Sequence, residues 1–359
     1  MEKIEKIKRI DGLDLMKTIA IMMVLMLHTS LWDTDFINNP SKGRVIQYAF
    51  RMISEGVPMF VFVNGFLLFR KSTLDLKKHY YKIVKLIFLT LIWGLILTLV
   101  GLKTRAPQED ITVEKVVHYI LTIQVGTPYT GFLWFLQNLA GLYLVFPMLK
   151  VVYDNAFGLF EKLFVIAMTF TVGVNVLQVV GEFIVNQKAL DVFNELLFFI
   201  NRYNPIGNNW YIFYFMLGAI AMHYFEKICE HRALLIGGGF AAWGVNVAIS
   251  LYLSKKTNIV YDGALFYRTI FFMFILAILA ITMTYQNNKR IMGKIIASIG
   301  KNTMGIYLLH TAVINLIIFY WWPITFIGRM FVYMMVFTIS WFASIVLKKV
   351  PIMHYLFEL

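Results

Sequence analysis

The sequence predicts an all-α fold: a polytopic helical bundle embedded in a membrane, with about ten transmembrane helices. Hydrophobic residues make up 59% of the chain, charged residues make up only 15%, and apolar segments recur from end to end. A soluble globule of this size needs more polar surface than this composition supplies. We therefore expect one membrane-embedded domain over residues 1–359, with no separate soluble domain.

Ten apolar segments are candidates for spanning helices, since about 20 apolar residues cross the hydrocarbon core of a bilayer. They lie at residues 13–31, 45–69, 83–102, 132–150, 160–180, 210–225, 233–253, 265–285, 299–320 and 324–347. The segment at 210–225 is short for a span, so nine or eleven crossings are the alternatives. The basic N-terminal stretch has no small-residue cleavage site after it, so we interpret it as the start of an uncleaved helix.

The lysine and arginine residues orient this bundle. With the N-terminus in the cytoplasm, about 20 of them fall on the cytoplasmic side and about 12 fall outside, which predicts an N-in, C-in topology. Because these cations lie between apolar segments, the net charge of +13 does not indicate nucleic-acid binding. The single cysteine, Cys229, excludes an intramolecular disulfide and a cysteine-based cluster, and we expect no metal site.

The first predicted helix contains ionisable residues. Burying such residues in a membrane costs free energy, so their presence indicates a structural or functional role. Lys17 and His28 are eleven residues apart, a spacing that returns to about the same helix face and separates them by roughly 16 Å along the axis. Lys17, near the cytoplasmic end, either binds an anionic group or extends to the lipid headgroups, and the second alternative is favoured. For His28, in the outer half, acid–base chemistry and a structural hydrogen bond are equally supported.

The first helix also resembles that of a known family. In RIDGLDLMKTIAIMMVLMLH, a Leu-Asp pair precedes a basic residue, and ten residues separate that residue from a histidine. This arrangement resembles the first helix of the acyltransferase-3 family of membrane enzymes, with Lys17 where the family usually has arginine. The exchange keeps the charge and loses the bidentate geometry of arginine, so anion binding there should be weaker or differently shaped.

Further segments follow in the order of the family. GVPMFVFVNGFLLFRK at 56–71 is similar to the second helix, with Asn64 where serine is usual. The basic loop KKHYYKIVKL resembles a cytoplasmic arginine-rich stretch, with Lys82 and Lys85 in place of arginines.

The resemblance continues to the C-terminal part of the chain. GFLWFLQNLAGLYLVFPML at 131–149 matches at Trp134 but has Phe132 where many members have histidine. SIGKNTMGIYLLH at 298–310 resembles the penultimate helix. The resemblance therefore spans most of the chain.

This resemblance implies a multispan O-acyltransferase of the bacterial plasma membrane. Such an enzyme moves an acyl group, most often acetyl, from cytoplasmic acyl-CoA to a hydroxyl of a cell-surface polysaccharide or related envelope glycan. Acetyl-CoA or another acyl-CoA is then a donor substrate and no cofactor is tightly bound, while the acceptor glycan or lipid-linked sugar and the membrane lipids are the partners. Members often carry an extracytoplasmic esterase-like domain, whereas we expect no separate soluble domain in this chain. A separate extracytoplasmic protein would therefore supply any second step outside.

Roles for particular residues follow from the resemblance. His28 is the catalytic base or the residue that receives the acyl group. Glu55 is the candidate to orient its imidazole, although an ion pair with Arg51, one turn away, is the favoured alternative. Four cations are the candidates for binding acyl-CoA, although the positive-inside pattern explains the basic loop at least as well. These cations are Lys17, Arg70, Lys82 and Lys85.

The candidates for binding the acceptor are Asn64, Trp134 and His310. His310 lies at a depth comparable with that of His28, so two imidazoles could converge on one cavity, and a packing hydrogen bond between helices is equally supported. Outer aromatic residues such as Trp210 are interfacial anchors or a surface on which a sugar stacks, with anchoring favoured.

The predicted outer stretch at 181–209 contains ALDVFNELLFFI, whose apolar spacing predicts a helix that lies in the interface or folds back over the membrane core. A transporter or flippase for a lipid-linked sugar or other amphiphile is the alternative function, because buried Lys and His residues also serve conduction paths. The absence of paired Gly/Pro interruptions in the two halves weakens that alternative.

Overall fold

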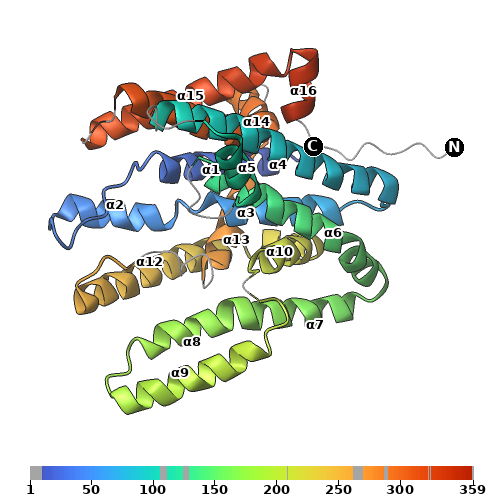
Figure 1. Ribbon diagram of the computed structural model, residues 1–359. Coiled ribbons are helices and arrows are strands. Elements are labelled where there is room, and N and C mark those ends of the chain that lie inside the picture. Colours follow the sequence, from blue (N-terminus) through green and yellow to red (C-terminus); the bar gives the residue numbers. More distant parts are fainter. Residues whose placement is uncertain are drawn as a thin grey trace. The chain divides into compact units, whose positions relative to one another are not determined.

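The computed structural model describes residues 10–105, 111–123, 129–207, 209–261, 270–286, 290–321, 323 and 325–357 (Figure 1). Within these ranges the chain forms helices and no strand, which confirms the all-α prediction. The α-helices are α1 (Asp11–His28), α2 (Lys42–Met52), α3 (Gly56–Phe69), α4 (Leu76–Arg105), α5 (Val113–Leu121), α6 (Trp134–Asn155), α7 (Phe157–Met168), α8 (Val174–Gly181), α9 (Gln187–Arg202), α10 (Tyr211–His223), α11 (Phe225–Glu230), α12 (Arg232–Thr257), α13 (Phe271–Thr282), α14 (Ile291–Tyr320), α15 (Phe326–Leu347) and α16 (Pro351–Phe357). A 3-10 turn, η1 (Gly131–Leu133), precedes α6, and a π-helical turn, η2 (Thr169–Gly173), joins α7 to α8.

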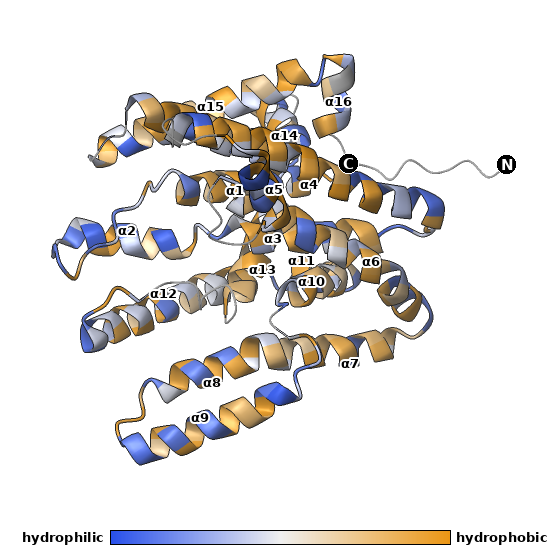
Figure 2. Cartoon of the chain, viewed as in Figure 1, coloured by the Kyte–Doolittle hydropathy of each residue, from blue (hydrophilic) through white to orange (hydrophobic). Residues whose placement is uncertain are grey.

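Seven helical segments of 22–30 residues within the described chain are long and apolar enough to cross a membrane. Figure 2 shows the apolar residues along them. They are Lys42–Phe69, Leu76–Thr104, Gly131–Asn155, Phe157–Gly181, Arg232–Thr257, Ile291–Tyr320 and Phe326–Leu347. The chain is therefore a multipass membrane protein.

The other three predicted spans coincide with helices that are shorter or more charged. The helices α10 and α13 have 13 and 12 residues, fewer than a crossing needs. The helix α1 has 18 residues but contains Asp11, Asp14 and Lys17. The first five residues of the span predicted at 265–285 lie outside the described residues. The count of ten and the N-in, C-in orientation stay predictions.

Packing divides the chain into two compact units, each assembled from three separate segments. The first unit comprises Met1–Met16, Asp33–Ser72 and Met148–Gln286, and the second comprises Lys17–Trp32, Thr73–Pro147 and Asn287–Leu359. The single domain over 1–359 stays a prediction.

In the first unit, α3 and α10 pack closely because each presents a glycine to the other. A Cβ atom at Gly65 would overlap the backbone of Phe215, and one at Gly218 would overlap the backbone of Phe62. Small residues at helix crossings bring backbones into van der Waals contact, which drives helix association where lipid removes the hydrophobic driving force. The sole cysteine, Cys229, is an exposed free thiol on α11 of the same unit.

The helix α6 extends beyond the predicted span at 132–150 because its last cation is neutralised. The Lys150 side chain is 6% exposed, and its Nζ forms an ion pair of 2.5 Å with Asp154 one turn later. The same Nζ donates a hydrogen bond of 3.3 Å to the Phe69 carbonyl oxygen at the end of α3. Because its ion pair and hydrogen bond compensate the cost of burial, the Lys150 ammonium can lie within the helix, and α6 continues past it to Asn155.

In the second unit, α14 packs against α4 and α15. The Thr18 Oγ1 of α1 donates to the Ile296 carbonyl of α14 over 3.5 Å, and the Trp93 indole of α4 donates to the Leu356 carbonyl of α16 over 3.2 Å. A Cβ atom at Gly305 would meet the Ser344 side chain, so α14 and α15 also cross at a glycine. These contacts hold α1 and α14, which carry the two predicted histidines.

Candidate active site

The local structure after α1 fixes the position of His28. His28 is the last residue of this helix, and the chain then turns through Ser30, whose φ is 48°. The Ser30 N–H donates to the Leu27 carbonyl over 3.1 Å and the Leu31 N–H donates to the Met26 carbonyl over 3.2 Å. This pair of bonds is the Schellman motif that ends many helices, usually with glycine in the left-handed position. The His28 side chain lies exposed at this helix end.

His310 lies within the long helix α14 and is 0% exposed. Its Nδ1 is hydrogen-bonded to the Tyr307 carbonyl oxygen, and its Nε2 lies 3.2 Å from the Thr311 hydroxyl oxygen. Because a carbonyl only accepts, Nδ1 carries the proton in the neutral ring, and Nε2 accepts from the Thr311 hydroxyl. The backbone of α14 thus fixes both the tautomer and the orientation of this imidazole.

The two histidines meet in the second unit. The ring centroids of His28 and His310 are 5.0 Å apart, with an angle of 53° between the ring planes. The comparable depth of these residues in the sequence predicted that they could converge, and the structure brings them together. One ring is exposed while the other is buried behind it.

An aromatic wall holds the histidine pair. The Phe132 ring packs edge-on against His310 at 5.0 Å and against His28 at 6.4 Å between centroids. The Tyr307 hydroxyl donates a hydrogen bond to the Phe132 carbonyl, which ties α14 to the η1 turn. Phe132 therefore fills a position beside both imidazoles.

This arrangement can perform two kinds of chemistry. An exposed neutral imidazole accepts a proton from a hydroxyl group or attacks an activated carbonyl as a nucleophile. The buried imidazole beside it has a fixed tautomer, and the surrounding aromatic rings exclude water from one side. Both reactions depend on the ring that a substrate can reach, which is that of His28.

The other candidates in the second unit lie at separate places on its helices. Lys17 is half-buried on α1, which continues without a break to His28. Lys82 and Lys85 are half-buried one turn apart on α4, and the Lys85 Nζ lies 5.9 Å from the Tyr355 ring centroid. Trp134 is half-buried as the first residue of α6, directly after the turn that carries Phe132.

Three candidates belong to the first unit. The Glu55 carboxylate accepts from the Arg51 guanidinium over 2.9 Å, which is the alternative partner weighed from the sequence. The Asn64 Nδ2 donates over 2.9 Å to the Phe60 carbonyl of its own helix. Arg70 caps the C-terminal end of α3 through its backbone N–H. The roles given to these residues stay predictions.

Some residues of the site were missed in the sequence. Tyr307 and Thr311 hold the His310 ring, and the Arg329 guanidinium donates to the Ser30 carbonyl over 3.4 Å. The contact between His310 and the Tyr307 carbonyl could have been predicted from the sequence, because a polar side chain in a helix can reach the backbone carbonyl three residues before it. Nothing in the local sequence around Arg329 indicates its contact with a residue 299 positions away.

Apolar spanning helices and an accessible imidazole backed by a second, buried one define a multipass membrane protein with a centre suited to acid–base or nucleophilic chemistry. The acyltransferase domain family Acyl_transf_3 matches residues 10–346, nearly the whole chain. The chain belongs to this family and is an enzyme that transfers acyl groups, which confirms the resemblance found in the sequence. Searches of curated proteins and of solved structures found no match.

Proposed function

We propose that this membrane acyltransferase moves an acyl group, most often acetyl, from cytoplasmic acyl-CoA to a hydroxyl of a cell-surface polysaccharide or related envelope glycan. We place it in the bacterial plasma membrane. The observation that carries the proposal is the accessible His28 ring, 5.0 Å from the buried His310 ring.

His28 acts in one of two ways. As a base, it takes the proton of the acceptor hydroxyl while the hydroxyl oxygen attacks the thioester carbonyl. The carbon–sulfur bond then breaks, and the CoA thiolate leaves and takes up that proton. As the acyl acceptor, an imidazole nitrogen attacks the thioester first and releases CoA, and the acceptor hydroxyl then attacks the acylimidazole and regenerates the free ring.

The donor carries several phosphate charges, which cations attract. Lys82 and Lys85 lie one turn apart on α4 and present two half-buried ammonium groups from one helix face. Lys17 lies about three turns from His28 on α1. These positions support binding of acyl-CoA phosphates at the cytoplasmic side of the predicted topology.

The test measures transfer of labelled acetyl from acetyl-CoA to cell-envelope material in membranes that hold matched amounts of wild-type or His28→Ala protein. We expect His28→Ala to lower the rate at least about 100-fold, the usual contribution of a positioned base. His310→Ala should also lower the rate, because it removes the ring behind His28. The control is His118→Ala, which changes an exposed histidine on α5.

Normal transfer by folded, membrane-inserted His28→Ala protein would overturn the role of His28. Equal labelling from wild-type, mutant and empty membranes would contradict acetyl transfer and lead to longer acyl donors. Accumulation of untranslocated precursor in a deletion strain, with acylation intact, would favour the transporter alternative.

A further inference from the structure

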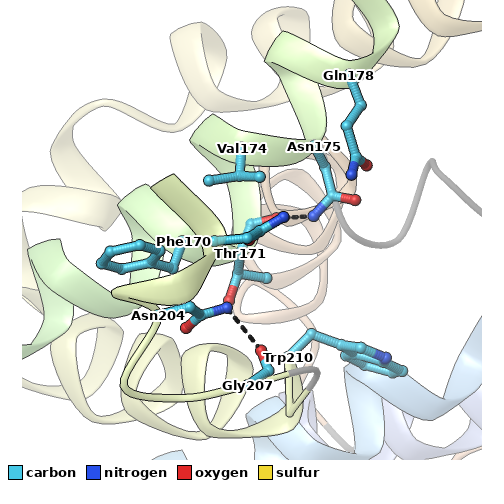
Figure 3. A pocket seen from close by; sticks show the side chains of 9 residues that line it. Phe170, Thr171, Val174, Asn175, Gln178, Asn204, Gly207 and Trp210 are labelled. Atoms are coloured by element: carbon cyan, nitrogen blue, oxygen red, sulfur yellow. Dashed lines mark hydrogen bonds between the residues drawn. The ribbon is translucent and has the colours of Figure 1, made fainter. Parts of the chain in front are cut away.

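A small polar pocket lies in the first unit (Figure 3). Its volume is about 70 Å³. The amide side chains that line it are Asn175 and Gln178 of α8, Asn201 of α9 and Asn204 of the following loop, and Trp210 closes one side. The helices α8 and α9 pack side by side, so the pocket forms at one end of their hairpin.

The π-helical turn η2 shapes the wall of this pocket. A π turn interrupts a candidate membrane span here, and such turns often occur at functional sites. The Asn175 Nδ2 donates over 2.6 Å to the Thr171 carbonyl within the widened turn. Asn175 and Gln178 belong to the span Phe157–Gly181, where polar side chains are costly and call for a role.

The opposite wall is a loop with a fixed shape. The Asn204 Nδ2 donates to the Gly207 carbonyl over 2.8 Å, and its Oδ1 accepts from the Ile206 N–H over 3.0 Å. Gly207 has a φ of 60°, a conformation that glycine adopts without strain. Trp210 is 8% exposed and packs edge-on against Tyr214 at 5.6 Å. The loop and the indole are therefore positioned before a ligand arrives.

The chemistry of the lining selects a neutral ligand with hydroxyl groups. Amides both donate and accept hydrogen bonds, as hydroxyl groups do. Of the nine lining residues that the structure describes, none is charged, so no ion pair would hold an ionic ligand. The pocket volume of about 70 Å³ is far smaller than the roughly 300–1,000 Å³ of a site that encloses a whole drug-sized ligand. At roughly 10–15 Å³ for each water, it holds about five waters. It accommodates the hydroxyl-bearing edge of one sugar residue.

We infer that this pocket is a subsite for one neutral sugar residue of the acceptor glycan. The link to the acceptor rests on the proposed function, while the binding of a neutral sugar rests on the pocket alone. The predicted topology places the stretch at 181–209 outside the membrane, where a surface glycan is available, and this stretch contributes Asn201, Asn204 and Gly207 to the pocket. The amides bind the sugar hydroxyls, and the apolar C–H face of the ring packs against the indole of Trp210.

Binding is measured without any acyl donor, by saturation-transfer NMR on the full chain in lipid nanodiscs. The probes are glucose, galactose and N-acetylglucosamine, with glucuronate and glucosamine as charged comparators. We expect at least one neutral sugar to bind and the charged sugars to bind more weakly. Asn201→Ala and Gln178→Ala should each weaken binding about fivefold, the effect of one lost hydrogen bond.

The matched control is Asn194→Ala, which removes an exposed amide two turns earlier on nearly the same face of α9. This variant and His28→Ala should bind the sugar as wild type does. No saturation transfer to any neutral probe, or an equal loss in Asn194→Ala and Asn201→Ala, would overturn the inference. Absence of acetyl transfer with intact sugar binding would contradict acetyl as the transferred group and leave the subsite standing. Acetyl transfer by an enzyme that binds no neutral sugar would overturn the subsite alone.

Discussion

At the scale of single residues, the position of the accessible imidazole depends on a neighbour that sits in an uncommon conformation. Ser30 adopts a left-handed φ of 48° two residues after His28. An L side chain in that region costs about 1–2 kcal/mol relative to the right-handed region. The two hydrogen bonds of the helix end offset this cost and hold the turn in place.

Substitution of Ser30 tests this account. Ser30→Gly should keep acetyl transfer and raise thermal stability slightly, because glycine adopts a positive φ freely. Ser30→Val should lower the free energy of unfolding by about 1–2 kcal/mol and reduce transfer, because a β-branched side chain resists this conformation. Thermal unfolding in detergent and the acetyl-transfer rate are the measurements. Equal behaviour of the two variants would contradict the account.

At the scale of helices, the crossing of α3 and α10 shows how the first unit holds together. Gly65 and Gly218 each meet the backbone of the partner helix, so neither position has room for a side chain. Apolar area alone does not fix such a crossing in lipid, since the lipid tails are equally apolar.

We expect Gly218→Ala to destabilise the protein by about 1–3 kcal/mol, the usual cost of overpacking. Gly237→Ala is the matched control, because no atom lies within 4 Å of the added methyl group in α12. Alanine favours a helix by up to about 1 kcal/mol over glycine, so this control should be neutral or stabilising. Melting temperatures of the two variants in the same detergent decide the matter, and a lower value for Gly237→Ala than for Gly218→Ala would contradict the packing.

Helix positions were predicted well from the sequence because apolar runs and their flanking charges are local features. The helix predicted within 181–209 is present as α9, which begins after the capping residue Asn186. The π turn at Thr169–Gly173 was not predicted, because no single residue in that stretch specifies an extra backbone position. Likewise the end of α6 depends on the ion pair of Lys150, which the apolar pattern does not reveal.

The site was predicted only in part for the same reason. The sequence indicated that His28 and His310 could converge, since both lie in the outer half of spans that run in one direction. The contact between Tyr307 and the Phe132 carbonyl joins residues 175 positions apart, and no spacing rule reaches so far. The pairing of Glu55 with Arg51 follows a local rule of helix spacing and was weighed in advance.

At the scale of the whole molecule, the predicted orientation places both termini and the α11 segment in the cytoplasm. The excess of lysine and arginine on that side is the basis of this prediction. Because the crossings alternate, one residue whose side of the membrane is known determines the side of every loop.

Cys229 supplies such a residue without any engineering, since it is the sole thiol of the chain and is exposed on α11. A membrane-impermeant maleimide should leave intact cells unlabelled at this position and label inverted vesicles. Asn194→Cys in a Cys229→Ser background should show the reverse, because α9 belongs to the predicted outer stretch. Labelling of Cys229 in intact cells would contradict the predicted orientation and support the opposite one. Labelling of the native thiol thus shows on which side of the membrane α11 lies.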